Sequence, residues 1–304
     1  MNENQDKVFS KTNINWYPGH MAKTKKQIQE DLKLIDVVVE VLDARIPTAS
    51  SNPDIQEWIK NKKKIIALNK ADLASEEENN KWINYFKKKE ISAVLTDSNS
   101  GKGINEIIRE IEKVNCEDKE MYANKGRVGK SIRVMVLGVP NVGKSSFINR
   151  ITKKSSAQVG NKPGVTRQKQ WIRVNEKIEL LDTPGVLWPK FENEQIALDL
   201  AYTGTIKDDI LEKTEIAYYL LKFLLENEKP KVIERYKLDI KEVEKILSDE
   251  ENMENENIME IMYMLGRKRG AIISGGNVDE EKVATILLDE FRSGKLGRIT
   301  IEKC

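Results

Sequence analysis

The chain has 304 residues, of which 39% are hydrophobic and 33% are charged, and its formal net charge is +2. This length accommodates one α/β domain of ordinary size and a second, smaller domain with its own core. The composition excludes a low-complexity chain, and the most apolar run, 37–42, is interrupted by Glu40, which excludes a membrane span. Only Cys116 and Cys304 could offer thiols, so a disulfide framework and a thiolate zinc site are excluded and a reducing, cytoplasmic compartment is expected.

Short β-branched runs alternate with helical patterns through the first two-thirds of the chain, which is typical of a doubly wound, mostly parallel α/β sheet. In chain order, strands are predicted at residues 37–42, 64–68, 92–95, 132–137, 171–174 and 178–181. Isoleucines at helical spacing over 104–111 predict one helix, and another is expected to begin at Lys144 after a glycine-containing turn. The polar segment 117–130 has no apolar periodicity and is interpreted as a linker.

Beyond residue 193 the pattern changes to amphipathic helices. They are expected around residues 211–224, 243–247, 258–265 and 283–291, and a last short strand is expected at 298–301. We therefore predict a first domain over residues 1–190, a linker over 191–205 and a mostly helical domain over 206–304.

The strongest motif is G-x-x-x-x-G-K-S over residues 138–145, which directly follows a predicted strand and directly precedes a predicted helix. Its glycines let the backbone wrap around phosphates, so that successive N–H groups and the positive helix N-terminus point at them. Lys144 is expected to reach the β- and γ-phosphates of a nucleotide, and Ser145 is expected to ligate Mg²⁺. The other nucleotide-binding residues predicted in and just after this loop are Asn141, Val142, Gly143 and Ser146.

A second phosphate-sensing motif, D-x-x-G over residues 182–185, ends the strand predicted at 178–181. Asp182 is expected to hold Mg²⁺ through water, and the N–H of Gly185 is expected to meet the γ-phosphate. Thr166 lies in a loop between the two motifs, where its hydroxyl can close on Mg²⁺ when a third phosphate is bound.

The preferred base is predicted from Asn69-Lys70-Ala71-Asp72, which follows the strand predicted at 64–68. The carboxylate of Asp72 can accept hydrogen bonds from N1–H and the exocyclic amine of guanine, a donor pair that adenine lacks at that edge. Asn69 is expected to support the loop and touch the other edge of the base, and the stem of Lys70 is expected to cover its face. The motif disfavours a P-loop kinase or an ATPase and predicts binding and hydrolysis of GTP.

The guanine motif precedes the phosphate loop, which reverses the usual chain order. Phosphate and base loops both lie at the carboxyl ends of strands in one sheet, so the site requires convergence in space rather than one chain order. The permutation also places the γ-phosphate-sensing residues immediately before the C-terminal domain, to which a loop movement can be passed directly.

These motifs resemble those of the circularly permuted GTPases, and the segments Trp16–Lys23 (WYPGHMAK) and Asp43–Pro47 (DARIP) narrow the resemblance to the ribosome biogenesis GTPase A family (YlqF/RbgA). The likeness spans nearly the whole chain. It implies a role in late assembly of the large ribosomal subunit, contacts with ribosomal RNA and ribosomal proteins, and a helical C-terminal domain that binds the particle. The implied cofactors are GTP and Mg²⁺, and Asn141 matches a position that helps to coordinate K⁺ in potassium-stimulated GTPases.

Two residues bear on hydrolysis. In Ras-like enzymes a glutamine after D-x-x-G orients the attacking water, and Val186 stands at that position here. His20 is the only histidine and lies in the family's N-terminal motif, so the resemblance implies that His20 is catalytic, alongside Lys144. Because Val186 cannot hydrogen-bond through its side chain, a nucleotide-gated RNA-binding scaffold with incidental hydrolysis stays open as the alternative.

The sequence departs from the family pattern in the loop expected to contact guanine. That loop has a Ser-Ala-Lys-like triplet in the family and reads Thr96-Asp97-Ser98 here. The predicted C-terminal domain holds more acidic than basic residues, so contacts with RNA phosphates would require a local basic patch. The candidates for this patch are Arg267, Lys268 and Arg269.

Overall fold

The computed structural model describes residues 19–116, 131–156, 171–183, 193–206, 212–249 and 254–304. The chain folds into two compact units. The first comprises the chain up to Ile196 together with Thr300–Cys304, and the second is Ala197–Ile299. The linker predicted at 117–130 lies outside the described residues.

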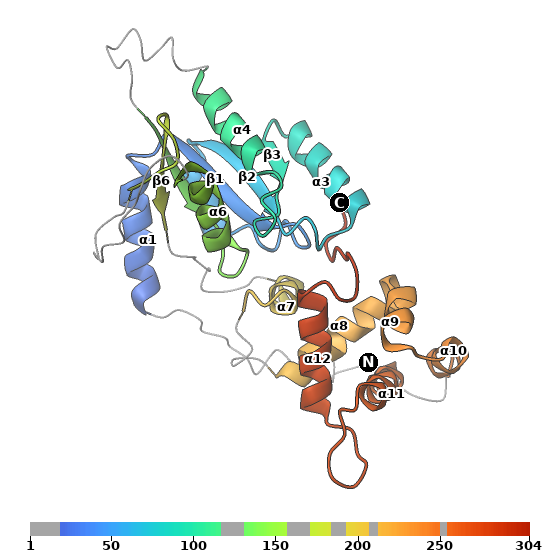
Figure 1. The fold of residues 1–304 in the computed structure, drawn as a ribbon. Coiled ribbons are helices and arrows are strands. Elements are labelled where there is room, and N and C mark those ends of the chain that lie inside the picture. The colour runs from blue at the N-terminus through green and yellow to red at the C-terminus, as the bar shows by residue number, and fades with distance from the viewer. Residues whose placement is uncertain (1–18, 117–130, 157–170, 184–192, 207–211, 250–253) are drawn as a thin grey trace, which may run out of the picture. The chain divides into compact units, whose positions relative to one another are not determined.

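Six strands of the first unit form one sheet in the order β3-β2-β1-β4-β6-β5 (Figure 1). They are β1 (Val37–Asp43), β2 (Lys63–Asn69), β3 (Ser92–Leu95), β4 (Ile132–Leu137), β5 (Trp171–Arg173) and β6 (Ile178–Asp182). Neighbouring strands are parallel except for the β5–β6 pair, which is antiparallel. The predicted mostly parallel sheet is confirmed, and each of these strands begins and ends within one residue of its predicted position.

Helices cover this sheet and complete the predicted doubly wound α/β fold (Figure 1). They are α1 (Gly19–Leu32), α2 (Pro53–Ile59), α3 (Glu76–Lys88), α4 (Ile104–Cys116) and α6 (Lys144–Ser156). The first three of these helices pack on the sheet face that carries Val38 and Leu42. Helices α4 and α6 contact each other and the strands β2 and β4.

The carboxyl ends of the parallel strands bring the sequence motifs to one edge of the sheet. Strand β1 is buried along its whole length, as expected for a parallel strand that is covered on both faces. Asp43 at the end of β1 lies in register with Asn69 at the end of β2. Because β4 and β6 run parallel to β1, the loops that follow them leave the sheet at the same edge.

The second unit is mostly helical in its described residues, as predicted. Its helices are α7 (Glu194–Tyr202), which belongs to this unit from Ala197 onward, α8 (Lys213–Asn227), α9 (Lys229–Tyr236), α10 (Ile240–Leu247), α11 (Glu254–Lys268) and α12 (Glu280–Arg292). Helices α8, α11 and α12 contact one another and bury their apolar residues, among them Leu220, Ile261 and Leu287. No helix in the described part of the chain is both long enough and apolar enough to cross a membrane.

Two expectations about the C-terminal half are wrong. The segment 191–205, interpreted as a linker, contains α7, and its Ala197, Leu200 and Ala201 are buried because their spacing forms one apolar helix face. The strand expected at 298–301 is not formed. Its β-branched residues Ile299, Thr300 and Ile301 are buried, and the amide of Ile301 donates to the carbonyl of Arg45 in the loop after β1 instead of to a strand.

The chain ends on the first unit. Residues Thr300–Cys304, which the sequence placed in the helical domain over 206–304, belong to the sheet-bearing unit. The C-terminus lies beside α3 (Figure 1), where the indole N–H of Trp82 donates to the carbonyl of Glu302 over 3.1 Å. The boundary between the two units therefore lies at two places in the chain, after Ile196 and before Thr300.

Candidate functional site

The phosphate loop lies between β4 and α6. At two of its glycines, neighbouring atoms lie so close to the backbone that a side chain would not fit. A Cβ on Gly143 would lie 2.3 Å from Nδ2 of Asn69, and one on Gly138 would lie 2.6 Å from the carbonyl oxygen of Val41. Gly143 and Asn141 also adopt left-handed backbone angles, with φ of 90° and 59°. The loop ends at the N-terminus of α6, where the N–H groups of the first turn and the helix dipole favour an anion.

Lys144 begins α6 and is brought to the end of β6. Lys144 is 8% exposed, and its ammonium group donates a hydrogen bond to the carbonyl oxygen of Thr183. The hydroxyl of Thr183 donates in turn to the carbonyl of Val136 on β4, over 2.6 Å. The next two residues of α6, Ser145 and Ser146, are exposed. The lysine of the phosphate loop and the start of the D-x-x-G segment thus lie together.

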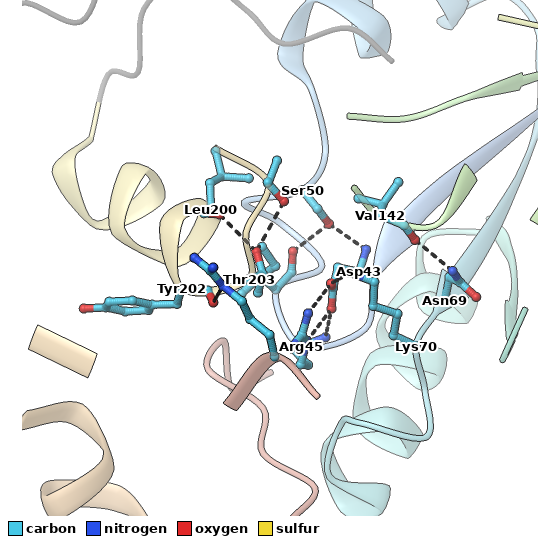
Figure 2. A network of polar contacts seen from close by, with 12 residues as sticks. Asp43, Arg45, Ser50, Asn69, Lys70, Val142, Leu200, Tyr202 and Thr203 are labelled. Carbon is cyan, nitrogen blue, oxygen red and sulfur yellow. Dashed lines mark hydrogen bonds and ion pairs between the residues drawn. The ribbon is translucent and has the colours of Figure 1, made fainter. Parts of the chain in front are cut away.

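Asn69 joins three loops through one side chain. Its Nδ2 donates to the carbonyl of Val142 in the phosphate loop over 2.8 Å (Figure 2). Its Oδ1 accepts hydrogen bonds from the amide and the hydroxyl of Ser98, over 3.1 Å and 2.7 Å, and from the hydroxyl of Thr96 over 3.3 Å. Asn69 is only 2% exposed, so its role in this structure is to hold the guanine motif, the phosphate loop and the loop after β3 together.

The loop after β3 is fastened to the guanine motif along its backbone. The amide of Ala71 donates to the carbonyl of Thr96 over 3.1 Å, and the amide of Thr96 donates to the carbonyl of Leu68 over 2.8 Å. Burial alone would raise the pKa of Asp97, but hydrogen bonds from Ser100 and Asn99 hold the pKa below its ordinary value of 3.8. The triplet that departs from the family pattern therefore still lies against the guanine motif, and Asp72 beside it is exposed.

Lys70 forms an ion pair with Asp43, a residue for which the sequence predicted no role in the site. The Lys70 ammonium lies 2.9 Å from Oδ2 of Asp43, and the guanidinium of Arg45 donates to both carboxylate oxygens of Asp43 over 3.0 Å and 2.8 Å (Figure 2). Asp43 is fully buried. Burial would raise the pKa of its carboxyl, but the charges of Arg45 and Lys70 outweigh burial and hold the pKa far below its ordinary value of 3.8.

A sequence signal for this ion-pair cluster exists. Asp43 and Asn69 end two adjacent parallel strands in the same register, so a side chain that follows β1 is expected to meet one that follows β2. From the sequence alone, Asp43 and Arg45 were noted only as residues of the DARIP segment that supports the family resemblance. The contact of Asp43 with Lys70 also depends on the left-handed φ of 58° at Lys70, which the sequence does not reveal.

Several predicted site residues are described only in part. His20 lies in the first turn of α1, and Asp182 is the last residue of β6, but their side chains are outside the described part of the structure. Thr166, Gly185 and Val186 lie outside it altogether. Among the described side chains, no group of three or more His, Cys, Asp or Glu residues could hold a metal ion.

Three motif-bearing segments leave the sheet at one edge: the phosphate loop after β4, the guanine-type loop after β2 and the D-x-x-G segment at the end of β6. Together they define a P-loop GTPase whose motifs follow a permuted order. The model of the 50S ribosome-binding GTPase family matches residues 133–262. Ribosome biogenesis GTPase A of Bacillus cereus is 43% identical to this chain, covering 95% of it and 93% of the relative. The chain belongs to the ribosome biogenesis GTPase A family and is a GTP hydrolase.

Two further similarities extend over most of the chain. The mitochondrial ribosome-associated GTPase 1 of Mus musculus is 35% identical to this chain, and the alignment covers 95% of this chain and 90% of the relative. The crystal structure of GNP-bound YlqF from T. maritima superimposes with a TM-score of 0.63 at 27% identity, covering 92% of this chain and 98% of that one.

Proposed function

We propose that this GTPase acts in late maturation of the large ribosomal subunit, binding the precursor particle in its GTP state and leaving after hydrolysis. The binding of GTP is supported by the hydrogen bonds of Asn69, which join the phosphate loop at Val142 to the loop after β3 at Ser98. Support for the ribosomal part comes from relatives that are named for ribosome biogenesis or for association with the mitochondrial ribosome. Ribosomal RNA and ribosomal proteins are the proposed partners, in the cytoplasm.

In this proposal the phosphates of GTP lie over the loop from Asn141 to Ser146. Lys144 exchanges the carbonyl of Thr183 for oxygens of the β- and γ-phosphates, because a charge-assisted bond to phosphate is stronger than one to a neutral carbonyl. Bound Mg²⁺ supplies neutralisation of the developing phosphate charge. Ser145, Thr166 and Asp182 are its proposed ligands, which fits the preference of Mg²⁺ for a few protein oxygens beside phosphate and water.

Guanine is read by the exposed carboxylate of Asp72 in this proposal, beside the stem of Lys70. Thr96, Asp97 and Ser98 form the neighbouring wall of the base site, since they are bonded to the guanine motif. Asn141 is the proposed K⁺ ligand next to the phosphates. Its left-handed backbone equally supports a purely structural role in the turn.

Hydrolysis requires a group that positions the attacking water, and Val186 cannot supply one. We propose His20, at the start of α1, for this role. Thr166 and Gly185 are the proposed sensors of the γ-phosphate. Particle binding would complete the site, as partners do for other GTPases.

The basic patch proposed for RNA contacts narrows to Arg267 and Lys268, which are exposed at the end of α11. Arg269 is committed to the fold of the second unit. Its guanidinium lies 3.0 Å from a carboxylate oxygen of Glu290 and 5.0 Å from the ring centroid of Tyr236. Only the first two side chains are therefore proposed to meet phosphates.

The test is GTP turnover by the full-length protein with and without large-subunit precursor particles. Acceleration by the particles, with binding that requires the GTP state, is the expected result. Nucleotide-dependent binding without acceleration would instead favour the RNA-binding scaffold with incidental hydrolysis. Competition by ATP at concentrations similar to GTP would contradict the assignment of the guanine motif.

A further inference from the structure

The C-terminal tail, Thr300–Cys304, is bonded to the loop that follows β1. The amides of Ile301 and Glu302 both donate to the carbonyl of Arg45, over 3.0 Å and 3.2 Å. The carboxylate of Glu302 accepts hydrogen bonds from the backbone amides of Thr48 and Ala49, over 2.5 Å and 2.7 Å. Hydrogen bonds from amides to a carboxylate are among the stronger ones in proteins, so the tail fixes this loop firmly.

The same tail is bonded on its other side to the segment that follows the guanine motif. The amide of Ser75, the residue before α3, donates to the hydroxyl of Thr300 over 2.9 Å. The amide of Cys304 donates to the carboxylate of Glu78 on α3 over 2.9 Å. The tail therefore joins the loop after β1 to the start of α3, the helix that follows the guanine motif at 69–72 in the chain.

A continuous set of contacts leads from the tail to the guanine motif. The tail holds the backbone of Arg45, and the Arg45 guanidinium holds Asp43 through two hydrogen bonds. Asp43 holds the ammonium of Lys70 (Figure 2). Arg45 and Asp43 are 1% and 0% exposed, so their ion pair is shielded from water and competing ions.

We propose that Glu302 and Arg45 are positioning residues for the guanine-reading loop, acting through Asp43 and Lys70, so that the C-terminal tail sets how well the protein discriminates guanine. Neither residue needs to touch the nucleotide. Loss of the tail's anchor lets the loop after β1 move, and Lys70 and the adjacent Asp72 lose their fixed place. The inference rests on the proposed role of Asp72 as the base reader.

The test compares the affinities of GDP and IDP for the purified full-length protein, by titration with fluorescent analogues. Inosine lacks the exocyclic amine, so the GDP-to-IDP preference reports the contact of Asp72 with that amine. In Glu302→Ala we expect GDP to bind roughly tenfold more weakly and IDP to lose less, because inosine has only N1–H to lose to Asp72 whereas guanine also loses the amine contact, so that the preference for GDP falls. Cys304→Ser is the matched control in the same tail, because its exposed side chain is changed and its bonded amide is kept.

A role limited to stabilising the fold would weaken both nucleotides equally or leave both unchanged, and either result in a folded variant overturns the proposal. Arg45→Lys serves as the second variant, since it keeps the charge but loses the bidentate geometry on Asp43. Because both residues act through one loop, the double variant should lose no more preference than the stronger single variant. Additive losses would contradict the shared route.

The wild-type protein separates this inference from the proposed function on which it rests. A wild type that binds GDP and IDP alike would overturn the assignment of Asp72 and the positioning role together. A wild-type preference that survives in both variants would overturn the positioning role alone.

Discussion

At the scale of single residues, Asp72 is the proposed reader of the base. Asp72→Asn should weaken GTP binding by roughly 10- to 100-fold, because it replaces a charged acceptor of two hydrogen bonds. It should also improve the binding of xanthosine triphosphate, whose O2 needs a donor that the amide supplies. Competition titrations with both nucleotides measure the exchange. Lys144→Ala is the control, since it should weaken both nucleotides alike, and no gain for the xanthine nucleotide would refute the base-reading role.

Asp43 should make the stability of the first unit depend on pH. Its pKa is depressed in the folded protein, so its contribution is fully present above the ordinary value of 3.8 and is lost as the pH falls through and below it. Asp43→Asn should lower the free energy of unfolding at pH 7 by about 3–5 kcal/mol, because it leaves the buried Arg45 without its partner charge.

Urea unfolding of the wild type and Asp43→Asn at pH 7, pH 5 and pH 3.5 measures this contribution. The difference between the two proteins should be similar at the two higher pH values and smaller at the lowest. A difference that is the same at all three would show that the Asp43 carboxylate gains nothing from its two cationic neighbours.

His20 is the residue proposed to replace the missing water-orienting glutamine. His20→Ala should lower particle-stimulated turnover by roughly 10²- to 10⁴-fold and leave GTP affinity near that of the wild type. Single-turnover hydrolysis on saturating particles is the measurement. An unchanged rate with intact particle binding would make His20 structural, and a loss of particle binding would make it a docking residue.

At the scale of elements, the end of α11 carries two kinds of basic side chain: Arg267 and Lys268 are exposed, whereas Arg269 pairs with Glu290. Replacing Arg267 and Lys268 together by alanine should weaken particle binding and reduce its dependence on salt, since each phosphate contact releases counterions. Sedimentation with particles at two salt concentrations measures this effect. Arg269→Ala is the contrasting variant. Because it removes the bonds of Arg269 to Glu290, it should lower the stability of the helical unit. Equal effects of both changes on particle binding would contradict this division.

Other elements explain which expectations failed. The strands were predictable because short, β-branched apolar runs bounded by polar residues are typical of strands in a covered sheet. Helix α7 was missed although Ala197, Leu200 and Ala201 have helical spacing, since the short apolar pattern follows polar residues typical of a linker. The segment 298–301 carries the β-branched residues of a strand, yet a strand also requires a free sheet edge, which is a property of the assembled fold.

At the scale of the whole molecule, the chain leaves the first unit after Ile196 and returns to it at Thr300. Deletion of residues 300–304 removes the hydrogen bonds to Arg45, Thr48, Ala49 and Ser75. The first unit should then unfold at a temperature roughly 5–10 °C lower, if the lost bonds contribute about 3 kcal/mol in total. Calorimetry of the full-length and shortened proteins measures the shift, and equal melting temperatures would mean that the tail contributes nothing to stability.

The sequence by itself determined the class of fold, the permuted order of the motifs and the kind of nucleotide. These depend on local patterns: apolar runs that form strands, glycines that permit a phosphate loop, and a carboxylate at the end of a strand. Only the tertiary structure decided that Asn69 joins three loops, that Asp43 and Arg45 hold Lys70, and that the last five residues rest on the sheet-bearing unit. Such contacts join side chains from different loops, and their geometry is set by the assembled sheet and by backbone angles that no local pattern records.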